Sequence, residues 1–512
     1  MSLIRSAKTP LHPWLRRSGR ETRRLVLLAL PICGAQLTQA GMGVADVMMT
    51  GRLSATDLAA VSVGASLWMP MMLFMLGTLM GLTPIVSECL GAGDPRLIRA
   101  RVHQALWVSL AMGILVGLML RQLAPIIFQW MDVPPEVAAR SGDYLAGVAL
   151  GMPGIALFLA LRAFSDGMSH TRPALWIGLI GLGVNIPANF LLIHGGGGVA
   201  ALLGPPAPAG LEALPALGAL GCGIATALSF WTMGLAMLLH TRRSPVYRPV
   251  ALWSRLTPPR PALIGELLFV GLPIGIAIFV EVTLFTLIAL LVASLGEITV
   301  AAHQVALNIT SFIFVLPLAL GMALTVRVSR ALGAGRPRQA RFVAWNGVLV
   351  SLVTALINGV FLLLLGEAVI GLYTHDAQVQ SLALSLIFLA VLFQLSDALQ
   401  LNMAGALRGY KDTRVLMMIT LLSYWAVGLA VGHWLATRGL GGGIPALGVH
   451  GYWIGLIMGL TVAALLLGLR LRAISRPDPA LSTDSVDNFV ESMSETLPVA
   501  GPITGPNNLN KK

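Results

Sequence analysis

The sequence predicts an all-α polytopic membrane protein in which twelve transmembrane helices form two pseudo-symmetric lobes of six. Composition is the first reason: 56% of the 512 residues are hydrophobic and only 11% are charged, whereas an ordinary soluble domain carries about 25% charged residues. The second reason is a series of long apolar runs, and the third is an internal duplication. A soluble globular protein and a disordered chain are both excluded, because lipid must be the solvent for most of these residues.

Twelve apolar runs are long enough to cross a bilayer, which requires about 20 mostly apolar residues in a helix. The runs are continuous rather than alternating, so a transmembrane β-barrel is excluded. The predicted spans lie at residues 25–49, 58–83, 102–120, 144–161, 174–193, 217–240, 265–294, 300–326, 342–365, 381–405, 415–436 and 446–469.

Basic residues indicate the orientation of these spans, because Lys and Arg gather in cytoplasmic loops. Of the 34 Lys and Arg residues, 30 fall at the two termini or in the loops on the same side. The four on the other side are Arg52, Arg121, Arg140 and Arg438. Both termini are therefore expected in the cytoplasm. The formal net charge of +12 is interpreted as this orientation signal in preference to a nucleic-acid surface.

The duplication is found by comparing the chain with itself at an offset of 242 residues. LGAGDPR at 90–96 then matches LGAGRPR at 332–338, and residues 30–99 contain 21 identities in 70 positions. PALG at 215–218 and at 445–448 changes the offset to 230, which indicates an insert in the Gly/Pro-rich loop near 195–214. Two halves inserted in the same orientation predict a pseudo-two-fold axis along the membrane normal and a substrate cavity between the lobes.

Five segments follow from these patterns. A basic cytoplasmic N-terminus covers residues 1–24, and an N-lobe of six helices covers 25–240. A cytoplasmic linker at 241–264 leads to a C-lobe of six helices at 265–472. Residues 473–512 are polar and acidic, which is typical of a disordered tail, here on the cytoplasmic side.

Three acidic residues lie inside the predicted spans: Asp46, Glu281 and Asp397. Each carboxylate costs about 2.5–3.5 kcal/mol at the bilayer centre on insertion scales, and we expect no Lys or Arg inside the spans to pair with them. The residues that match them at the 242-residue offset are the uncharged Ile288, Gln39 and Ile155. Because the fold symmetry does not repeat these acids, we interpret them as ion-coupling residues. If Glu281 and Asp397 approach each other, the pair can bind a proton or Na⁺.

Neutral polar residues accompany the acids. Asn185 and Asn189 are spaced i, i+4 and share one helix face. Their candidate partners in the same half are Asp46 and Thr226, and the alternative is ordinary hydrogen bonding between helices. The glutamines suited to lining a cavity, with helix packing as the alternative, are Gln36, Gln39 and Gln304.

Enzyme motifs are not found in the sequence. The glycine-rich LGAGDPR and LGAGRPR segments lack the G-K-[ST] ending of a phosphate-binding loop and are expected to form tight cytoplasmic turns. His103 and His303 have no second metal ligand at a suitable spacing, and the three Cys residues show no disulfide or metal pattern. We therefore expect neither enzymatic activity nor a cofactor, and no metal site beyond Na⁺ at Glu281 and Asp397.

Further motifs surround the polar residues. They are VADVMMTG around Asp46, DGMSHTRPALW leading into NIPANFLLIHG, FVEVTLF around Glu281 and LRGYKDTR at 407–414. Together with the LPI and LGAG motifs of both halves, they resemble the multidrug and toxic compound extrusion (MATE) family, in its bacterial NorM-like branch. The resemblance runs from about Leu25 to Arg470, and it implies a multi-pass protein of the bacterial inner membrane.

The resemblance also implies an antiporter that exports chemically varied, often cationic or amphipathic drugs in exchange for Na⁺ or H⁺, and so confers antibiotic resistance. Glu281 and Asp397 match the family's cation site in the second lobe. The matching N-lobe polar site consists of Asp46, Asn185, Asn189 and Thr226. The expected substrate-binding residues are Asp397, Gln304, Asp376, Ser66 and Gln39. Phe314 and Phe393 stand where a tyrosine is expected, so the choice between Na⁺ and H⁺ stays open.

The expected mechanism is alternating access by a monomer. A proton or Na⁺ that neutralises Glu281 and Asp397 would weaken the hold on a cationic drug, which couples the two fluxes. One alternative is a lipid-linked oligosaccharide flippase of the same superfamily, which needs a cationic central cavity. Another is a drug/proton antiporter outside the MATE family, although the charge pattern expected between its second and third spans is absent.

Overall fold

The computed structural model describes residues 13–203, 215–438 and 445–476. In these ranges the chain forms helices without strands, and twelve helical segments are long and apolar enough to cross a membrane. The predicted fold class is therefore confirmed. The predicted disordered tail lies outside the described residues from 477 onward, as does the part of the predicted insert at 204–214.

Six spans form each lobe. The first lobe consists of α1 (Pro13–Leu53), α2 (Ala55–Met80) continued by α3 (Leu82–Gly91), α4 (Arg96–Trp130), α5 (Pro135–Gly167), α6 (Arg172–Leu203) and α7 (Gly218–Arg243). The second lobe consists of α8 (Pro261–Ala293), α9 (Glu297–Gly333), α10 (Pro337–Tyr373), α11 (Ala377–Gly409), the segments α12 (Thr413–Leu421), η3 (Leu422–Leu429) and α13 (Ala430–Arg438) as one span, and α14 (Val449–Ile474). A short 3₁₀ helix, η2 (Pro245–Val250), lies between the lobes in sequence.

Each predicted span lies inside an observed helix or extends beyond its end by at most three residues. Several helices are longer than the predicted spans. Helix α1 begins at Pro13, inside the segment assigned to the basic N-terminus, and α5 continues to Gly167, beyond the predicted end at 161. Hydropathy detects only the part of a helix that lies in lipid. The extensions are polar turns that pack against other helices at the same end of the molecule.

The backbone repeats at the two offsets found in the sequence. Gly93 and Gly335 both adopt positive φ, as do Ser169 and Lys411, and each pair is 242 residues apart. Gly218 and Gly448, which are 230 residues apart, both have φ of 55°. Special backbone geometry thus recurs at equivalent turns, which supports the pseudo-symmetric relation between the lobes.

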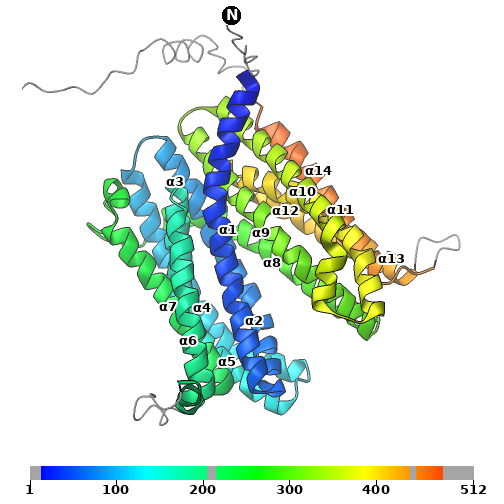
Figure 1. Cartoon of the computed structure of the whole chain (residues 1–512). Helices are drawn as coiled ribbons and strands as arrows, with labels where there is room; N and C mark the ends of the chain where they lie inside the picture. Colours follow the sequence, from blue (N-terminus) through cyan, green and yellow to red (C-terminus); the bar gives the residue numbers. More distant parts are fainter. Residues whose placement is uncertain (1–12, 204–214, 439–444, 477–512) are drawn as a thin grey trace, which may run out of the picture.

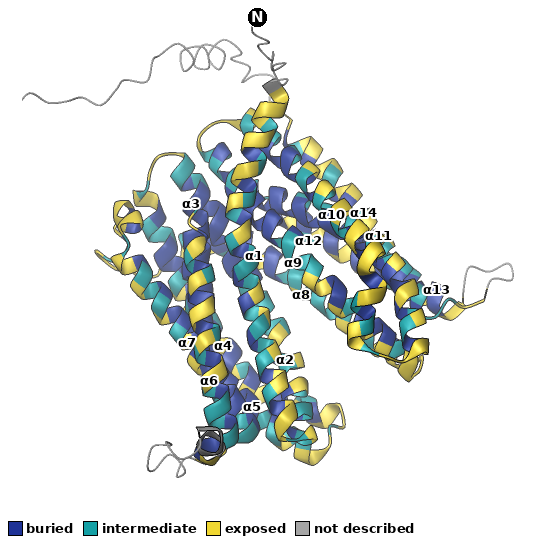
Figure 2. Cartoon of the chain, in the orientation of Figure 1, coloured by how far each residue is buried: buried dark blue, intermediate teal, exposed yellow. Residues whose placement is uncertain are grey.

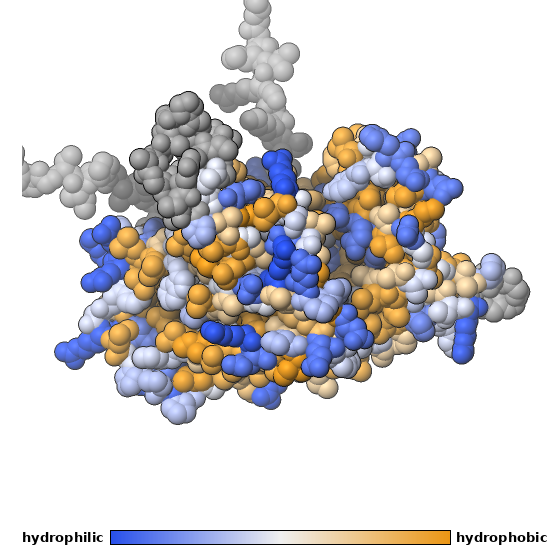
Figure 3. All heavy atoms as spheres, turned by 90° about the horizontal axis from the view of Figure 1, so that it is seen from below, coloured by the Kyte–Doolittle hydropathy of each residue, from blue (hydrophilic) through white to orange (hydrophobic). Residues whose placement is uncertain are grey.

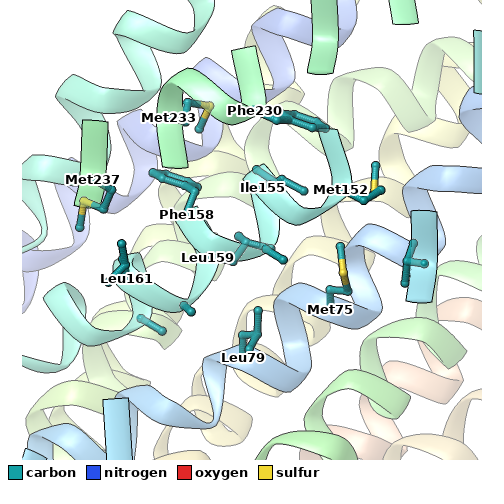
Figure 4. Packing of buried hydrophobic residues seen from close by; sticks show 14 of the residues in the cluster. Met75, Leu79, Met152, Ile155, Phe158, Leu159, Leu161, Phe230, Met233 and Met237 are labelled. Atoms are coloured by element: carbon teal, nitrogen blue, oxygen red, sulfur yellow. The ribbon is translucent and has the colours of Figure 1, made fainter. Parts of the chain in front are cut away.

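The two lobes meet at the end where α1 begins and diverge toward the opposite end (Figure 1). Buried residues gather inside each lobe and where the lobes meet, while the outer faces of the helices are exposed (Figure 2). In the first lobe, residues of α2, α5 and α7 such as Met75, Phe158 and Met233 interlock in the core (Figure 4). Seen from the divergent end, hydrophobic residues lie beside hydrophilic ones on the face of the molecule (Figure 3).

Glycines allow close contact between the lobes. A Cβ atom at Gly81, between α2 and α3, would lie 2.6 Å from the Cα atom of Gly271 in α8. A Cβ at Gly91 would lie 2.3 Å from the carbonyl oxygen of Arg330, and one at Gly333 would lie 2.0 Å from that of Glu88. The last two contacts are equivalent under the 242-residue offset. The lobes are therefore sealed near the pseudo-two-fold axis by backbone packed on backbone.

Polar contacts surround this seal. Glu88 forms an ion pair with Lys411, and Arg330 donates a hydrogen bond of 3.1 Å to the Ser169 hydroxyl. These two contacts are also equivalent under the offset. Further along the same end, Arg327 of α9 donates to both carboxylate oxygens of Glu21 in α1, at 2.7 and 2.8 Å. The structure is thus a conformation closed at the end that carries the start of α1.

Candidate functional site

The polar residues predicted in the first lobe lie together. Asn185 and Asn189 of α6 donate to Oδ1 of Asp46 at 3.2 and 2.5 Å, and the Thr226 hydroxyl of α7 donates to Oδ2 at 3.0 Å. All four side chains are buried. Asp46 therefore has three neutral donors, and no Lys, Arg or His side chain forms an ion pair with it within the described residues.

The second-lobe acids lie in a cavity of about 300 Å³ between the lobes. Glu281 of α8 and Asp397 of α11 both line it and repel each other electrostatically. Asp397 is buried, and its Oδ2 atom has no hydrogen-bond partner among the described residues. A buried acceptor without a partner is costly, so this oxygen is available to accept a hydrogen bond or to contact a cation.

The walls of this cavity are mainly apolar. The second lobe contributes Phe285, Phe314, Phe393, Leu307 and Met322, among others, and the first lobe contributes Gln36, Leu73, Leu76 and Met80. Phe393 is held edge-on by Phe285 and Trp453, with ring centroids 6.1 and 5.8 Å apart. Both phenylalanines that replace an expected tyrosine, Phe314 and Phe393, thus line the cavity without a phenol oxygen.

A buried arginine also lines this cavity, which corrects the expectation that no Lys or Arg lies inside. Arg408, in the last turn of α11, is buried and interacts electrostatically with Glu281. The predicted span ended at residue 405 and left Arg408 in the following loop, but the helix continues to Gly409. Two carboxylates and one guanidinium leave the cavity with a formal charge of −1 when all three are ionised.

A second buried charge pair was missed in the first lobe. Arg162 and Asp166 of α5 are both buried, with 3.6 Å between Nε and Oδ2. They were assigned beyond the predicted span for the same reason. A signal was present in the sequence, because the 242-residue offset places Asp166 on Arg408. The repeat therefore places an acidic residue in one half opposite a basic residue in the other. This difference could have identified both residues as candidates for a functional site.

Tyr424 is another residue that the sequence analysis did not select. It lies in the π-helical segment η3, is buried, and its hydroxyl has no hydrogen-bond partner among the described residues. Its phenol group lies near Glu281, Asp397 and Arg408. Short π-helical segments are frequent at functional sites, but this one has no sequence signature.

The other expected substrate-binding residues are not among those that line this cavity in the described part of the chain. Gln39 is half-buried in α1, and Ser66 and Gln304 are exposed in α2 and α9. Asp376 caps the start of α11, where its Oδ1 accepts from the backbone N–H groups of Gln378 and Val379 at 2.8 and 3.2 Å. Its observed contacts are those of an N-cap.

The two histidines have structural contacts. His103 contacts the Leu252 carbonyl and the Thr257 hydroxyl in the segment between the lobes, and His303 accepts a hydrogen bond from Trp453. Among the described residues, no group of three or more His, Cys, Asp and Glu side chains is placed to hold a metal ion.

Comparison with known sequences identifies the family. The sequence model of the MatE family matches the chain twice, over residues 31–191 and 273–434. The chain belongs to the MATE family. The two matches begin 242 residues apart, which is the offset of the internal duplication.

Relatives of this MATE protein are known in several bacteria. It is 44% identical to the multidrug resistance protein PmpM of Pseudomonas aeruginosa, over 92% of this chain and 95% of that protein. It is 42% identical to the probable multidrug resistance protein NorM of Shewanella oneidensis, over 90% and 97% of the two chains. These matches place it in the bacterial NorM-like branch.

Solved MATE structures share its fold. One, described as the outward-facing conformation of a multidrug resistance MATE family transporter, has a TM-score of 0.78 at 19% identity and covers 89% of this chain and 96% of its own. The eukaryotic MATE transporter AtDTX14 has a TM-score of 0.76 at 22% identity, with the same coverage.

Proposed function

We propose that this MATE protein is a secondary active multidrug exporter of the bacterial inner membrane, which exchanges Na⁺ or H⁺ for cationic amphipathic drugs by alternating access. The observation that carries the proposal is the cavity between the lobes, with apolar walls and two carboxylates opposed by one guanidinium. The names of its relatives as multidrug resistance proteins agree with this function.

The cavity suits an organic monocation. Aromatic and aliphatic walls bind a ligand by burying apolar surface without fixing its shape, which permits chemically varied substrates. With all three groups ionised, the formal charge of −1 favours a positive ligand, and Oδ2 of Asp397 has no hydrogen-bond partner among the described residues. Charge and hydrophobic burial, rather than a specific set of hydrogen bonds, would thus define the substrate class.

Competition for the same negative charge would couple the two fluxes. A proton or Na⁺ bound at Glu281 and Asp397 neutralises the group that attracts the drug, so each ligand lowers the affinity for the other. Asp46, with its donors Asn185, Asn189 and Thr226, would form a second ion-coupling site. Its carboxylate has hydrogen bonds but no basic partner in the described part of the chain, so it can still gain a proton or a monovalent cation.

The conformation fits one step of such a cycle. With the predicted cytoplasmic location of both termini, the sealed end faces the cytoplasm and the divergent end faces outward (Figure 1). In this state the coupling ion would enter and the drug would leave. Gln39, Ser66, Gln304 and Asp376 are proposed to contact the drug along its route rather than in the cavity.

The test is ethidium uptake into everted vesicles, in which the cytoplasmic face points outward, under an imposed Na⁺ gradient and, separately, a proton gradient. Glu281→Gln and Asp397→Asn are expected to abolish ion-driven export and to weaken ethidium binding about tenfold, which corresponds to about 1.4 kcal/mol. Glu297→Gln, which changes an exposed acid on α9, is the matched control. Wild-type export by both cavity variants would overturn the mechanism.

One observation favours a second function. Arg408 places a positive charge in the cavity, as a flippase of phosphate-linked oligosaccharides would require. The two carboxylates outnumber it, so drug export is the better supported function. Lipid-linked oligosaccharide translocation in proteoliposomes, without ethidium export, would reverse this order.

A further inference from the structure

A cluster of arginines lies at the sealed end, away from the transport cavity. Arg17, Arg20 and Arg24 of α1 are spaced three and four residues apart, which places them along one helix face. This face borders the region where α9 ends and α10 begins, and there Arg327, Arg330 and Arg336 belong to the second lobe. Arginines from both lobes therefore meet across the interface.

The arginines line two adjoining cavities of about 250 and 340 Å³, which share Arg24, Arg336 and Gln339. Helix α1 is fixed beside them by hydrogen bonds: the Ser18 hydroxyl donates to Oδ1 of Asn346 at 2.5 Å, and Nδ2 of Asn346 donates to the Thr22 hydroxyl at 3.2 Å. We call these two cavities the arginine cleft. Arg327 and Arg330 are half-buried in this recess, and Arg17, Arg20, Arg24 and Arg336 are exposed along it.

The charge of the arginine cleft is not balanced by the described residues. Its single carboxylate, Glu21, is already bound by Arg327 through two hydrogen bonds. Six guanidinium groups and one carboxylate leave a formal charge of +5. Arg20 and Arg336 form no ion pair within the described part of the chain. Orientation in the membrane requires only a number of basic residues on one side, not their convergence on one recess.

We propose that the arginine cleft binds a phosphate-bearing anion. Planar guanidinium groups donate pairs of hydrogen bonds that match phosphate oxygens, and the negative charge of a bound phosphate reduces the repulsion between the clustered arginines. The cleft lies on the predicted cytoplasmic side, where anionic lipid headgroups are held near basic pockets between helices. The phosphate can belong to such a headgroup or to a soluble phosphate.

Binding at this place would connect the lobes. Arg17, Arg20 and Arg24 belong to the first lobe, and Arg327, Arg330 and Arg336 belong to the second. The cleft exists only where the lobes are in contact, so its ligand stabilises the conformation that is sealed at this end. The inference does not depend on which drug is exported or on which ion drives export.

The test measures thermal unfolding of the full chain in nanodiscs of phosphatidylcholine with increasing phosphatidylglycerol, in phosphate-free buffer, and in phosphatidylcholine nanodiscs titrated with inorganic phosphate. The variant is Arg20→Gln with Arg336→Gln. Its matched control is Arg242→Gln with Arg243→Gln, which removes two exposed arginines near the end of α7, on the same side of the membrane.

Wild type and the control are expected to gain stability from one of the two anions, and the cleft variant is expected to need about tenfold more of it. A response to phosphatidylglycerol alone assigns the site to a lipid headgroup, and a response to inorganic phosphate assigns it to soluble phosphate. Equal responses of the variant and the control, or no response of wild type, would overturn the proposal. Ethidium binding is measured on the same samples, so that a failure of the transport proposal is recognised separately.

Discussion

At the scale of residues, the buried carboxylates of the two lobes have opposite surroundings. Asp46 accepts hydrogen bonds from three neutral donors, whereas Asp397 has an oxygen without a partner and shares its cavity with Glu281 and Arg408. The aspartate of the first lobe thus has hydrogen-bond donors from the protein for both oxygens, whereas the aspartate of the second lobe has one oxygen that is available to a ligand.

Replacing Asn189 tests the first arrangement. Asn189→Ala removes the donor 2.5 Å from Asp46 and leaves the buried carboxylate with fewer hydrogen bonds. We expect a loss of about 1–3 kcal/mol in the free energy of unfolding, measured by denaturation of the purified protein in detergent. Asn308→Ala, at an exposed position of α9, should change it by much less. Equal effects of the two variants would contradict the role of Asn189.

Replacing Arg408 tests the second arrangement. Arg408→Gln removes the positive charge from the cavity, so ethidium is expected to bind about tenfold more tightly. An uncharged amphipathic drug should bind as it does to wild type, which controls for damage to the cavity. Binding is measured by fluorescence titration, with Arg408→Lys as the variant that keeps the charge. Weaker ethidium binding by Arg408→Gln alone would show that the guanidinium does not oppose cationic ligands.

At the scale of elements, the seal depends on helices that approach through glycine. Helices α3 and α9 contribute Gly91 and Gly333, each of which packs on the backbone of the other helix. Because this contact lies between the lobes, a side chain added at either position would destabilise the sealed conformation and would leave the stability of each separate lobe unchanged.

Gly333→Ala tests this element. Its Cβ would lie 2.0 Å from the Glu88 carbonyl oxygen, so we expect a penalty of about 1–3 kcal/mol on the sealed conformation. The measurement is the distance between spin labels at Arg52→Cys and Glu367→Cys, in a background without the native cysteines. The distance distribution should move toward shorter values. Gly265→Ala, with nothing within 4 Å of its Cβ, should leave the distances unchanged, and an unchanged Gly333→Ala would refute the glycine seal.

At the scale of the whole molecule, the two lobes share their backbone arrangement but differ in the positions of their charged side chains. The contacts of Glu88 with Lys411 and of Ser169 with Arg330 occupy equivalent positions, but only one of them is an ion pair. The ion-coupling candidates and the arginine cleft are also asymmetric. The symmetry therefore describes how the lobes pack, while function depends on where the lobes differ.

The orientation of the molecule is testable by labelling. In intact cells, a membrane-impermeant maleimide is expected to modify Arg52→Cys and to leave Arg242→Cys unmodified, because basic loops stay in the cytoplasm. Both residues are exposed, so permeabilised cells should show labelling at both. The reverse pattern in intact cells would place the sealed end outside and would contradict the proposed direction of export.

The sequence by itself determined the twelve spans and the duplication, and it named the candidate polar partners of Asp46. Lipid is a uniform solvent, so a run of apolar residues decides locally whether a helix crosses it. Likewise, the i, i+4 spacing of Asn185 and Asn189 decides locally that they share a face.

Only the tertiary structure revealed the further buried charges beside these acids. Arg408 and the pair of Arg162 with Asp166 lie on helix ends that extend past the apolar runs, so hydropathy assigned them to loops. Their burial results from packing with helices distant in the sequence. The same packing brings α1 to α9 and α10 and so forms the arginine cleft. Whether a segment spans the membrane depends on its own residues and the surrounding lipid, whereas a binding site depends on which segments pack against one another.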